Sequence, residues 1–315
     1  MYQSILEDLY QRYYQGSGDT SSVTSSFWHD FGGRHAVTIE DGQWKAMGFG
    51  IGYFVTDTWG NAIRHFPETL LSKQLLAKHQ CATRLAEIAY TLARLSGRRF
   101  VFDCAKQVLA VNEIRKGLAV SMTDPHPFRK RDVRVVCVIG DGYGYCTSIL
   151  KRLDPELTVI SVNLGRSLFF DVLYSKKCLT EERPAIMTAM GGREDILGAH
   201  TLIFLEAENY QYLSGLPVDL FINITSMQEM EPGVVDNYFR YMRESSADKV
   251  HFYCCNRLEK RLPDSTLVNF HDYPWNNSTV LMDELCAWHQ RYPSSGIPVW
   301  RKFDGPHQHR FVRLK

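Results

Sequence analysis

The fold is decided by residues 135–146, which read VVCVIGDGYGYC. The five consecutive apolar residues Val135–Ile139 are typical of a parallel strand that is buried on both faces. A glycine-rich turn follows at once, and residues 147–153 continue with the spacing of an amphipathic helix. The stretch therefore predicts a strand, a tight turn and a helix, which is the unit that builds a doubly wound α/β domain.

The turn consists of Gly140, Asp141, Gly142, Tyr143 and Gly144. Gly140 and Gly142 lack the Cβ atoms that would keep a cofactor away from the backbone, and Gly144 lets the helix begin close to the strand. A dinucleotide fingerprint, G-x-G-x-x-G, needs glycine at position 145, where the chain has Tyr145. The spacing G-x-G-x-G favours S-adenosylmethionine over a nicotinamide dinucleotide. A purely structural turn is the alternative.

Short β-branched runs separated by helical segments fill the C-terminal half. The strand candidates are residues 133–139, 157–162, 201–205, 220–224, 250–254 and 311–314. Strands that alternate with helices predict a parallel, doubly wound, Rossmann-like sheet.

The N-terminal part has a different pattern. Apolar residues at helical spacing predict helices over residues 4–14 and 67–96, and further helix over 111–118. Residues 124–132 combine two prolines with four successive charges, which suits an exposed connection. We therefore divide the chain into a mainly helical lobe, residues 1–128, and an α/β domain, residues 129–315.

Two further segments of the lobe stand out. Residues 16–26 are rich in Gly, Ser, Thr and Asp, which predicts a flexible segment that could act as a lid. Residues 44–59 are rich in glycine and aromatic residues, which either pack one lobe onto the other or line a substrate cavity. His29, His35 and His65 are the histidines of this lobe that could reach over a cleft.

Composition excludes several classes of protein. The 315 residues include 36 Lys plus Arg and 35 Asp plus Glu, a net charge of +1, so no overall field attracts nucleic acid or an anionic membrane. A hydrophobic content of 44% excludes a disordered chain. No apolar run approaches the roughly 20 residues of a membrane span. Because the first eight residues lack the pattern of a secretory signal, we expect a cytoplasmic protein.

The eight cysteines form no C-x-x-C pair and do not cluster beside histidines in the sequence. A disulfide scaffold and a zinc site are therefore disfavoured, and we expect no metal. His307 and His309 would share one face of a strand, but two histidines without a third ligand make a poor metal site. We interpret them as an incidental surface pair.

Polar residues follow the next two predicted strands. Asn163 and Leu164 come at the end of the second strand, where an open α/β sheet places the cofactor ribose. An amide can bind a ribose hydroxyl, although it lacks the strength of a charged acceptor. Glu206 follows the third strand, where an adenine edge would be read; a solvated surface charge is the alternative.

The run from Asn223 to Glu229 leaves the fourth strand of the predicted sheet. Ligands of open α/β sheets bind at this edge, so we expect Asn223 and Thr225 to contact the cofactor and Gln228 to contact the acceptor. Glu229 is a candidate general base, or it holds a substrate hydroxyl. A carboxylate that only interacts with a helix dipole is the alternative for Glu229.

Residues after the fifth strand complete the candidate site. Asn256 lies at the equivalent edge, and the loop 269–277 concentrates a histidine, an acid, two aromatic residues and two amides. His271 has the ordinary pKa best suited to accept a proton near neutrality. We therefore expect His271 as a second candidate base and Asn256, Tyr273 and Trp275 as acceptor contacts.

The glycine turn and residues 219–230, DLFINITSMQEM, together resemble the sugar O-methyltransferases of polyether and surface-polysaccharide pathways. The likeness covers roughly residues 130–300, and the second motif is the more specific. It implies a class I S-adenosylmethionine-dependent methyltransferase (EC 2.1.1.-), with the glycine turn and the Asn223 to Glu229 segment at the cofactor and active site. Two positions depart from the pattern: Val138 stands where an acid usually closes the first strand, and Asn163 replaces the ribose-binding acid.

We therefore expect in-line methyl transfer from S-adenosylmethionine to a hydroxyl of a sugar or sugar-decorated natural product, with Glu229 or His271 as the base. Transfer to nitrogen or carbon is the nearest alternative. A non-catalytic scaffold that binds the cofactor is another, favoured by the missing acids at Val138 and Asn163. The expected partners are the donor and a small-molecule acceptor, and the sequence leaves a homo-oligomer open.

Overall fold

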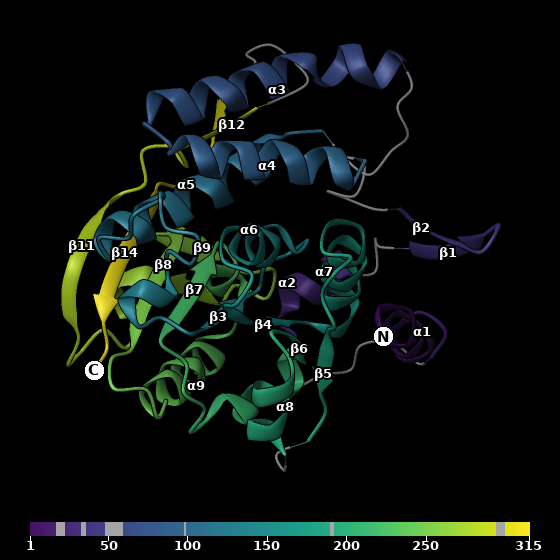
Figure 1. Cartoon of the computed structure of the whole chain (residues 1–315). Coiled ribbons are helices and arrows are strands. Elements are labelled where there is room, and N and C mark those ends of the chain that lie inside the picture. The colour runs from purple at the N-terminus through teal and green to yellow at the C-terminus, as the bar shows by residue number, and fades with distance from the viewer. Residues whose placement is uncertain (17–22, 33–35, 48–58, 98, 190–191, 294–299) are drawn as a thin grey trace.

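The computed structural model describes most of the chain (Figure 1). The described residues are 1–16, 23–32, 36–47, 59–97, 99–189, 192–293 and 300–315. Within them, one large sheet carries helices on both of its faces.

The main sheet has eight strands among the described residues, in the order β11-β14-β8-β7-β3-β4-β6-β5. They are β3 (Val135–Ile139), β4 (Thr158–Asn163), β5 (Ala185–Met187), β6 (Leu202–Glu206), β7 (Leu220–Ile224), β8 (His251–Arg257), β11 (Thr279–Leu285) and β14 (His307–Arg313). From β5 across to β8 all neighbours are parallel, whereas β14 is antiparallel to both β8 and β11. The chain reverses direction across the sheet at β3, which lies between β4 and β7. This confirms the expected doubly wound α/β fold.

All six predicted strands are present, although β14 begins at His307, four residues earlier than expected. The sequence missed β5 and β11. β5 has only three residues, too few for a pattern. β11 is an edge strand in which Val280 and Leu281 are 52% and 45% exposed. Strand prediction assumes that apolar residues are buried, and in β11 they are not.

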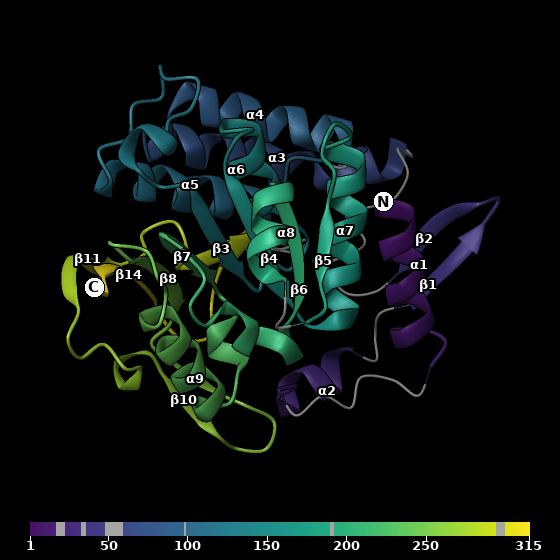
Figure 2. The ribbon, with the colours of Figure 1, turned by 60° about the horizontal axis from the view of Figure 1, so that its bottom comes forward.

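Helices cover both faces of the sheet (Figures 1 and 2). One face packs against α6 (Tyr145–Leu153) and α7 (Gly165–Cys178), with α4 (Thr83–Leu95) and α5 (Phe102–Gly117) against them and α3 (Trp59–Lys78) outermost. The other face packs against α8 (Arg193–Ala199) and α9 (Pro232–Arg243). β3 alternates between the two cores, with Val136 and Val138 in one and Cys137 and Ile139 in the other. The strand is therefore buried on both faces, as its sequence predicts.

The remaining elements are short. They are α1 (Tyr2–Tyr13), α2 (Ser26–Gly32), the hairpins β1 (Ala36–Glu40) with β2 (Gln43–Met47), β9 (Glu259–Arg261) with β10 (Leu267–Asn269) and β12 (Arg291–Pro293) with β13 (Trp300–Lys302), and the 3₁₀ turns Arg129–Arg131, Ala207–Leu213, Met227–Glu229 and Phe270–Asp272. Figure 2 shows α1 beside α7. No helix in the described part of the chain is long and apolar enough to cross a membrane.

The helical prediction over residues 67–96 was partly wrong. The structure has two helices, α3 and α4, with a break at residues 79–82. α3 begins at Trp59, so Pro67 lies inside the helix rather than at its start. The 111–118 segment is the end of α5, as expected.

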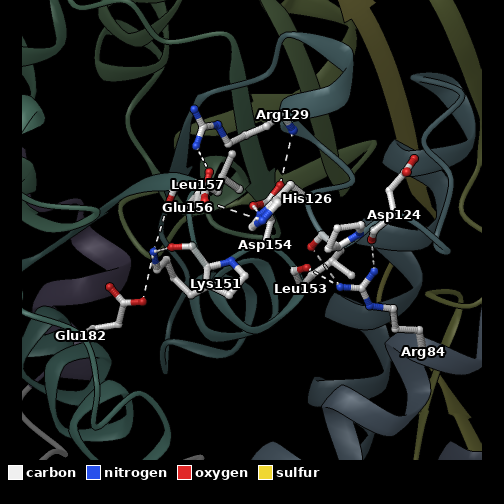
Figure 3. Close-up of polar contacts among 12 residues, drawn as sticks. Arg84, Asp124, His126, Arg129, Lys151, Leu153, Asp154, Glu156, Leu157 and Glu182 are labelled. Carbon is white, nitrogen blue, oxygen red and sulfur yellow. Dashed lines mark hydrogen bonds and ion pairs between the residues drawn. The ribbon is translucent and has the colours of Figure 1, made fainter.

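Polar contacts tie the lobe helices to the sheet domain (Figure 3). Arg84 of α4 donates hydrogen bonds to the carbonyls of Met122, at 3.0 Å, and of Leu153, at 2.8 Å. The buried Asp154 accepts one from Nδ1 of His126, at 3.1 Å. Residues of both parts also belong to one core cluster. The division at residue 128 stays a prediction, but the two parts share a core.

Lys151, at the end of α6, is a buried cation with a full set of acceptors (Figure 3). Its Nζ donates to the carbonyls of Pro155, at 2.6 Å, and Leu157, at 3.0 Å, and lies 3.1 Å from Oε1 of Glu182. Burial lowers the pKa of Lys151, and Glu182 opposes that shift.

We expect Lys151→Met to lower the free energy of unfolding by about 3 kcal/mol, because it removes the ion pair with the half-buried Glu182 and leaves two carbonyls without their donor. Chemical denaturation at pH 7 measures this. The control is Lys130→Met, which removes a surface ion pair with Asp124 and should change stability by no more than about 0.5 kcal/mol. Equal stability of the two variants would contradict the assignment.

Candidate functional site

Two adjoining cavities lie at the carboxyl ends of the central strands, the edge at which the sequence predicts the site. They enclose about 510 Å³ and about 1360 Å³, counting the space that opens to solvent. The residues that line both are Trp28, Gly140, Gly142, Ser226 and Glu229. Because they share this wall, the cavities lie next to each other, and we call them the first and the second cavity.

The first cavity is mostly apolar. Besides the shared wall, its lining comprises Val23, Val162, Asn163, Leu164, Ala207, Met230, Val234 and Tyr238. The second cavity is larger and is lined by more charged and polar side chains. Its further lining comprises Phe27, Asp103, Lys106, Gln107, Asp141, Tyr143, Tyr145, Ile224, Thr225, Gln228, Arg257, Lys260, His289, Phe303 and His307.

The three glycines of the turn, Gly140, Gly142 and Gly144, all have a positive φ, of 69°, 83° and 71°. They differ in what a side chain at each position would contact. A Cβ on Gly140 would collide with the side chain of Ser226, and one on Gly144 would lie 2.9 Å from the carbonyl oxygen of Asp171. A Cβ on Gly142 would meet no described atom within 4 Å. Close packing therefore requires Gly140 and Gly144, whereas Gly142 leaves the backbone open to the cavities.

The side chain of Asp141 binds the helix that follows the turn. Its two carboxylate oxygens accept hydrogen bonds from the backbone N–H groups of Cys146, at 2.9 Å, and Thr147, at 2.7 Å. These are orphan donors of the first turn of α6. Burial raises the pKa of Asp141, and these hydrogen bonds oppose the rise. Asp141 thus fixes the shape of the turn.

A second buried acid, Asp171 of α7, was missed by the sequence reasoning. It accepts hydrogen bonds from Oγ of Ser161, at 3.2 Å, and Nδ2 of Asn163, at 2.9 Å. Burial, followed by the charge of Asp141, raises the pKa of Asp171 well above its ordinary value. The available signal was an acid inside the apolar helix sequence LFFDVLY, because such an acid needs buried partners.

Two residues predicted to contact the cofactor, Asn163 and Glu206, form hydrogen bonds to other residues of the protein. Asn163 lines the first cavity with Leu164, but its amide binds Asp171 and the backbone N–H of Leu164, at 3.0 Å. Glu206 is 5% exposed and is not part of either cavity lining among the described residues. Its Oε1 lies 2.5 Å from both the hydroxyl of Tyr13 and Nη1 of Arg12. The alternative of a solvated Glu206 is therefore wrong, because the end of α1 covers this carboxylate.

Asn223 and Asn256 form a buried amide pair at the ends of β7 and β8. Nδ2 of Asn223 donates to the carbonyl of Ile139, at 2.9 Å, and Oδ1 accepts from Asn256, at 2.8 Å. Oδ1 of Asn256 accepts from the backbone N–H of Gln228, at 3.1 Å. Neither asparagine belongs to the described cavity linings. The pair instead fixes the backbone of Ile139 and Gln228 next to the second cavity.

Thr225 and Gln228 do reach the second cavity, as the sequence predicts. Thr225 has a φ of 65°, which is unusual for a β-branched residue and marks a strained backbone. Oε1 of Gln228 accepts from the backbone N–H of Arg257, at 2.7 Å. These contacts fix the backbone conformation of residues 225–228 along the wall of the second cavity.

Glu229 lies where the two cavities meet. Its Oε1 is 2.6 Å from Nζ of Lys260 on β9, and the ammonium lies 3.8 Å from the ring centroid of Phe27. Burial raises the pKa of Glu229, and Lys260 opposes that rise. Glu229 is therefore a partly desolvated carboxylate with one cation beside it.

Several residues of the second cavity come from segments that sequence reasoning did not connect. Asp103, Lys106 and Gln107 belong to α5, whereas His289 and His307 come from the C-terminal part. No local motif marks them, because only the packing of α5 over the sheet edge brings them together.

The interpretation of His307 and His309 as a surface pair was wrong. Both side chains are 1% exposed. The ring of His307 stacks on that of His289, with centroids 4.1 Å apart and planes 5° apart. Nδ1 of His309 is 3.0 Å from the hydroxyl of Tyr253.

The loop that contains His271 lies outside both cavities as the described residues form them. His271 is exposed, and its backbone N–H donates to Oδ1 of Asn269, at 2.9 Å. Tyr273 and Trp275 pack with Phe239 under the sheet instead. Tyr273 and Trp275 therefore contribute to core packing, whereas His271 lies at the surface.

Two expectations fall partly outside the described residues. Most of the suggested lid, at 17–22, and most of the aromatic stretch, at 48–58, belong to the undescribed segments, as does His35. The side chain of His65 is also not described, and His29 is exposed.

No protein-family model matches the chain, and no curated protein matches its sequence significantly. Solved structures do match. A putative sarcosine dimethylglycine methyltransferase from Galdieria sulphuraria has 7% identity over 67% of this chain and 85% of its own, with a TM-score of 0.43. The O-methyltransferase TomG from Streptomyces achromogenes, solved in complex with SAM, has 13% identity over 68% and 89%, with a TM-score of 0.35.

A third match is the geranyl diphosphate C-methyltransferase from Streptomyces coelicolor A3(2), with 11% identity over 58% of this chain and 70% of its own and a TM-score of 0.38. With identities of 7%, 13% and 11%, these likenesses leave the function to be inferred from the cavities themselves.

Proposed function

We propose that the chain is an S-adenosylmethionine-dependent methyltransferase that acts on a hydroxyl of a sugar or of a sugar-decorated natural product. The supporting observation is the shared wall at the glycine turn. There, an apolar cavity adjoins a larger one that is lined by several charged and polar side chains, and an ionisable carboxylate, Glu229, lines both.

The residues present fit the donor. In this proposal the first cavity holds the nucleoside against Val162, Leu164 and Ala207. The open backbone at Gly142 lies against the methionine part, since no described atom occupies the space beside it. Asp141, Asn163, Asn223 and Glu206 act as positioning residues, because their side chains bond within the protein.

The bound donor supplies a methyl group already activated on a sulfonium. The chain contributes alignment of the two reactants and removal of a proton. With the donor bound, Glu229 would accept the hydroxyl proton of the acceptor on a carboxylate oxygen. The donor would supply the methyl group through cleavage of its sulfur–methyl bond and leave as S-adenosylhomocysteine. Lys260, at 2.6 Å, favours the ionised form of this carboxylate.

The acceptor occupies the second cavity. Its polar lining includes Gln107 and Gln228, which can donate and accept hydrogen bonds as sugar hydroxyls require. Because α5 contributes Asp103, Lys106 and Gln107, we also propose that the lobe of residues 1–128 supplies part of the acceptor specificity.

The ion pair between Glu229 and Lys260 leads to a prediction for the pH dependence of the reaction rate. Without Lys260, the pKa of Glu229 rises further, so a Lys260→Met variant needs a higher pH to ionise its base. We expect the acid limb of its pH–rate profile to move up by about one to two units. The control is Arg261→Met, an exposed cation on the same strand, which should leave the profile in place. A shift to lower pH would contradict this role.

Calorimetric titration with S-adenosylhomocysteine tests the proposed function. We expect micromolar binding with one site per chain, followed by methyl transfer to at least one member of a panel of hexoses and glycosides. No binding at millimolar ligand would overturn the proposal. Binding without transfer to any hydroxyl, amine or carbon acceptor would favour a scaffold, and transfer to an amine or carbon would change the acceptor atom.

A further inference from the structure

Three buried side chains with metal-ligating atoms meet beside the second cavity. They are Cys255 near the end of β8, Cys286 just after β11, and His289. Sγ of Cys255 is 3.7 Å from Nδ1 of His289, and the three ligand atoms lie within 4.8 Å of one another. Each side chain is at most 1% exposed.

Local structure brings these atoms together. Cys286 and His289 have C-x-x-H spacing, and the backbone N–H of His289 donates to the carbonyl of Cys286, at 2.9 Å, which closes a tight turn. The backbone N–H of Cys286 donates to the carbonyl of His307, at 2.9 Å, and β14 pairs with β8. The turn is therefore anchored next to Cys255, 31 residues earlier in the sequence.

One distance in the cluster fits a tetrahedral metal site, and all three ligand atoms lie within 4.8 Å of one another. With zinc–sulfur bonds of about 2.3 Å and zinc–nitrogen bonds of about 2.0 Å, ligand atoms of a tetrahedral site lie roughly 3.5–3.8 Å apart. The separation of 3.7 Å between Cys255 and His289 has this value. Two sulfurs and one imidazole are also the ligand types that favour zinc over magnesium or calcium.

The imidazole is prepared for this role. The ring of His289 is fixed between His307, stacked at 4.1 Å, and Phe303, at 5.2 Å between ring centroids. Its Nδ1 lies on the side of the cluster, 3.7 Å from Sγ of Cys255.

We propose that Cys255, Cys286 and His289 bind a zinc ion. Binding releases the two thiol protons, and the two thiolates balance the charge of the ion, so the buried site gains no net charge. Three protein ligands leave a fourth position for water or a substrate atom. Because His289 also lines the second cavity, the ion fixes one wall of that cavity.

The sequence disfavours zinc because it lacks C-x-x-C pairs and clusters of cysteines beside histidines. The C-x-x-H turn at 286–289 supplies only two ligands, and the third comes from a distant strand. This inference is independent of the methyl donor, since it concerns metal binding by the chain alone.

Zinc titration of the chelator-treated full-length protein tests the site, with a chromophoric chelator as competitor. We expect one zinc ion per chain with sub-micromolar affinity, and a rise in Tm when zinc is added. Cys286→Ser should weaken binding at least about 100-fold. The control is Cys137→Ser, a buried cysteine of β3 outside the cluster, which should bind zinc as the parent does.

A second measurement uses the unaltered protein, in case the serine variant does not fold. Zinc should slow alkylation of two of the eight cysteines, and peptide mapping should identify them as Cys255 and Cys286. Protection of other cysteines would overturn the proposal. So would the absence of zinc binding at micromolar metal, unchanged affinity in Cys286→Ser, or a disulfide between Cys255 and Cys286 in protein purified under reducing conditions.

Discussion

A Gly142→Ala variant is expected to bind S-adenosylhomocysteine about 10–100 times more weakly than the parent, which corresponds to about 1.4–2.8 kcal/mol. The reason is geometric. The Cβ of the new alanine would meet no atom of the described residues within 4 Å, so its methyl group would enter the space that the proposed ligand occupies. Calorimetric titration measures the affinity, and thermal unfolding measures the effect on the fold.

The positive φ of 83° at Gly142 adds a backbone penalty of about 1 kcal/mol for any alanine there. Gly215 provides the matched control, because it has a φ of 75°, equally open surroundings and no place in either described cavity. Gly215→Ala should lose similar stability and keep the affinity of the parent. Equal affinities for the two variants would mean that the donor does not lie against the turn.

A Glu229→Gln variant is expected to lose about 10²–10⁴-fold in kcat while it keeps the donor affinity of the parent. Glutamine preserves the shape of the side chain but cannot take a proton from the acceptor hydroxyl. Release of S-adenosylhomocysteine with the acceptor found in the panel measures the rate, and calorimetry measures donor binding.

The control for this variant is Glu259→Gln, an exposed carboxylate on the same hairpin as Lys260, which should leave kcat unchanged. His271→Gln decides between the two bases that the sequence suggested. A large loss in His271→Gln together with full activity in Glu229→Gln would reject the assignment, because His271 would then be the base despite its exposed position.

The sequence predicted those parts of the fold that depend on neighbouring residues. The strand Val135–Ile139, the glycine turn and α6 form one local pattern, and the burial of the strand on both faces follows from its apolar run. The edge where Thr225, Gln228 and Glu229 emerge was also predicted, because it follows from the direction of a parallel strand.

The rest depends on long-range packing. Asn223 was placed at the correct edge, but its side chain turns inward because the buried carbonyl of Ile139 needs a donor. Asp103 and Lys106 line the second cavity only because α5 packs over the edge of the sheet. Their spacing in the sequence does not indicate this packing. His271 has suitable chemistry, but its loop is used to cover a core.

The contact between Gly144 and Asp171 has a consequence for recognising related chains. The turn is braced by an acid from a later helix, which also holds Ser161 and Asn163. A relative that keeps the three glycines but replaces this acid would leave the hydroxyl of Ser161 and the amide of Asn163 without this acceptor. We therefore expect positions 161, 163 and 171 to vary together among this chain's relatives.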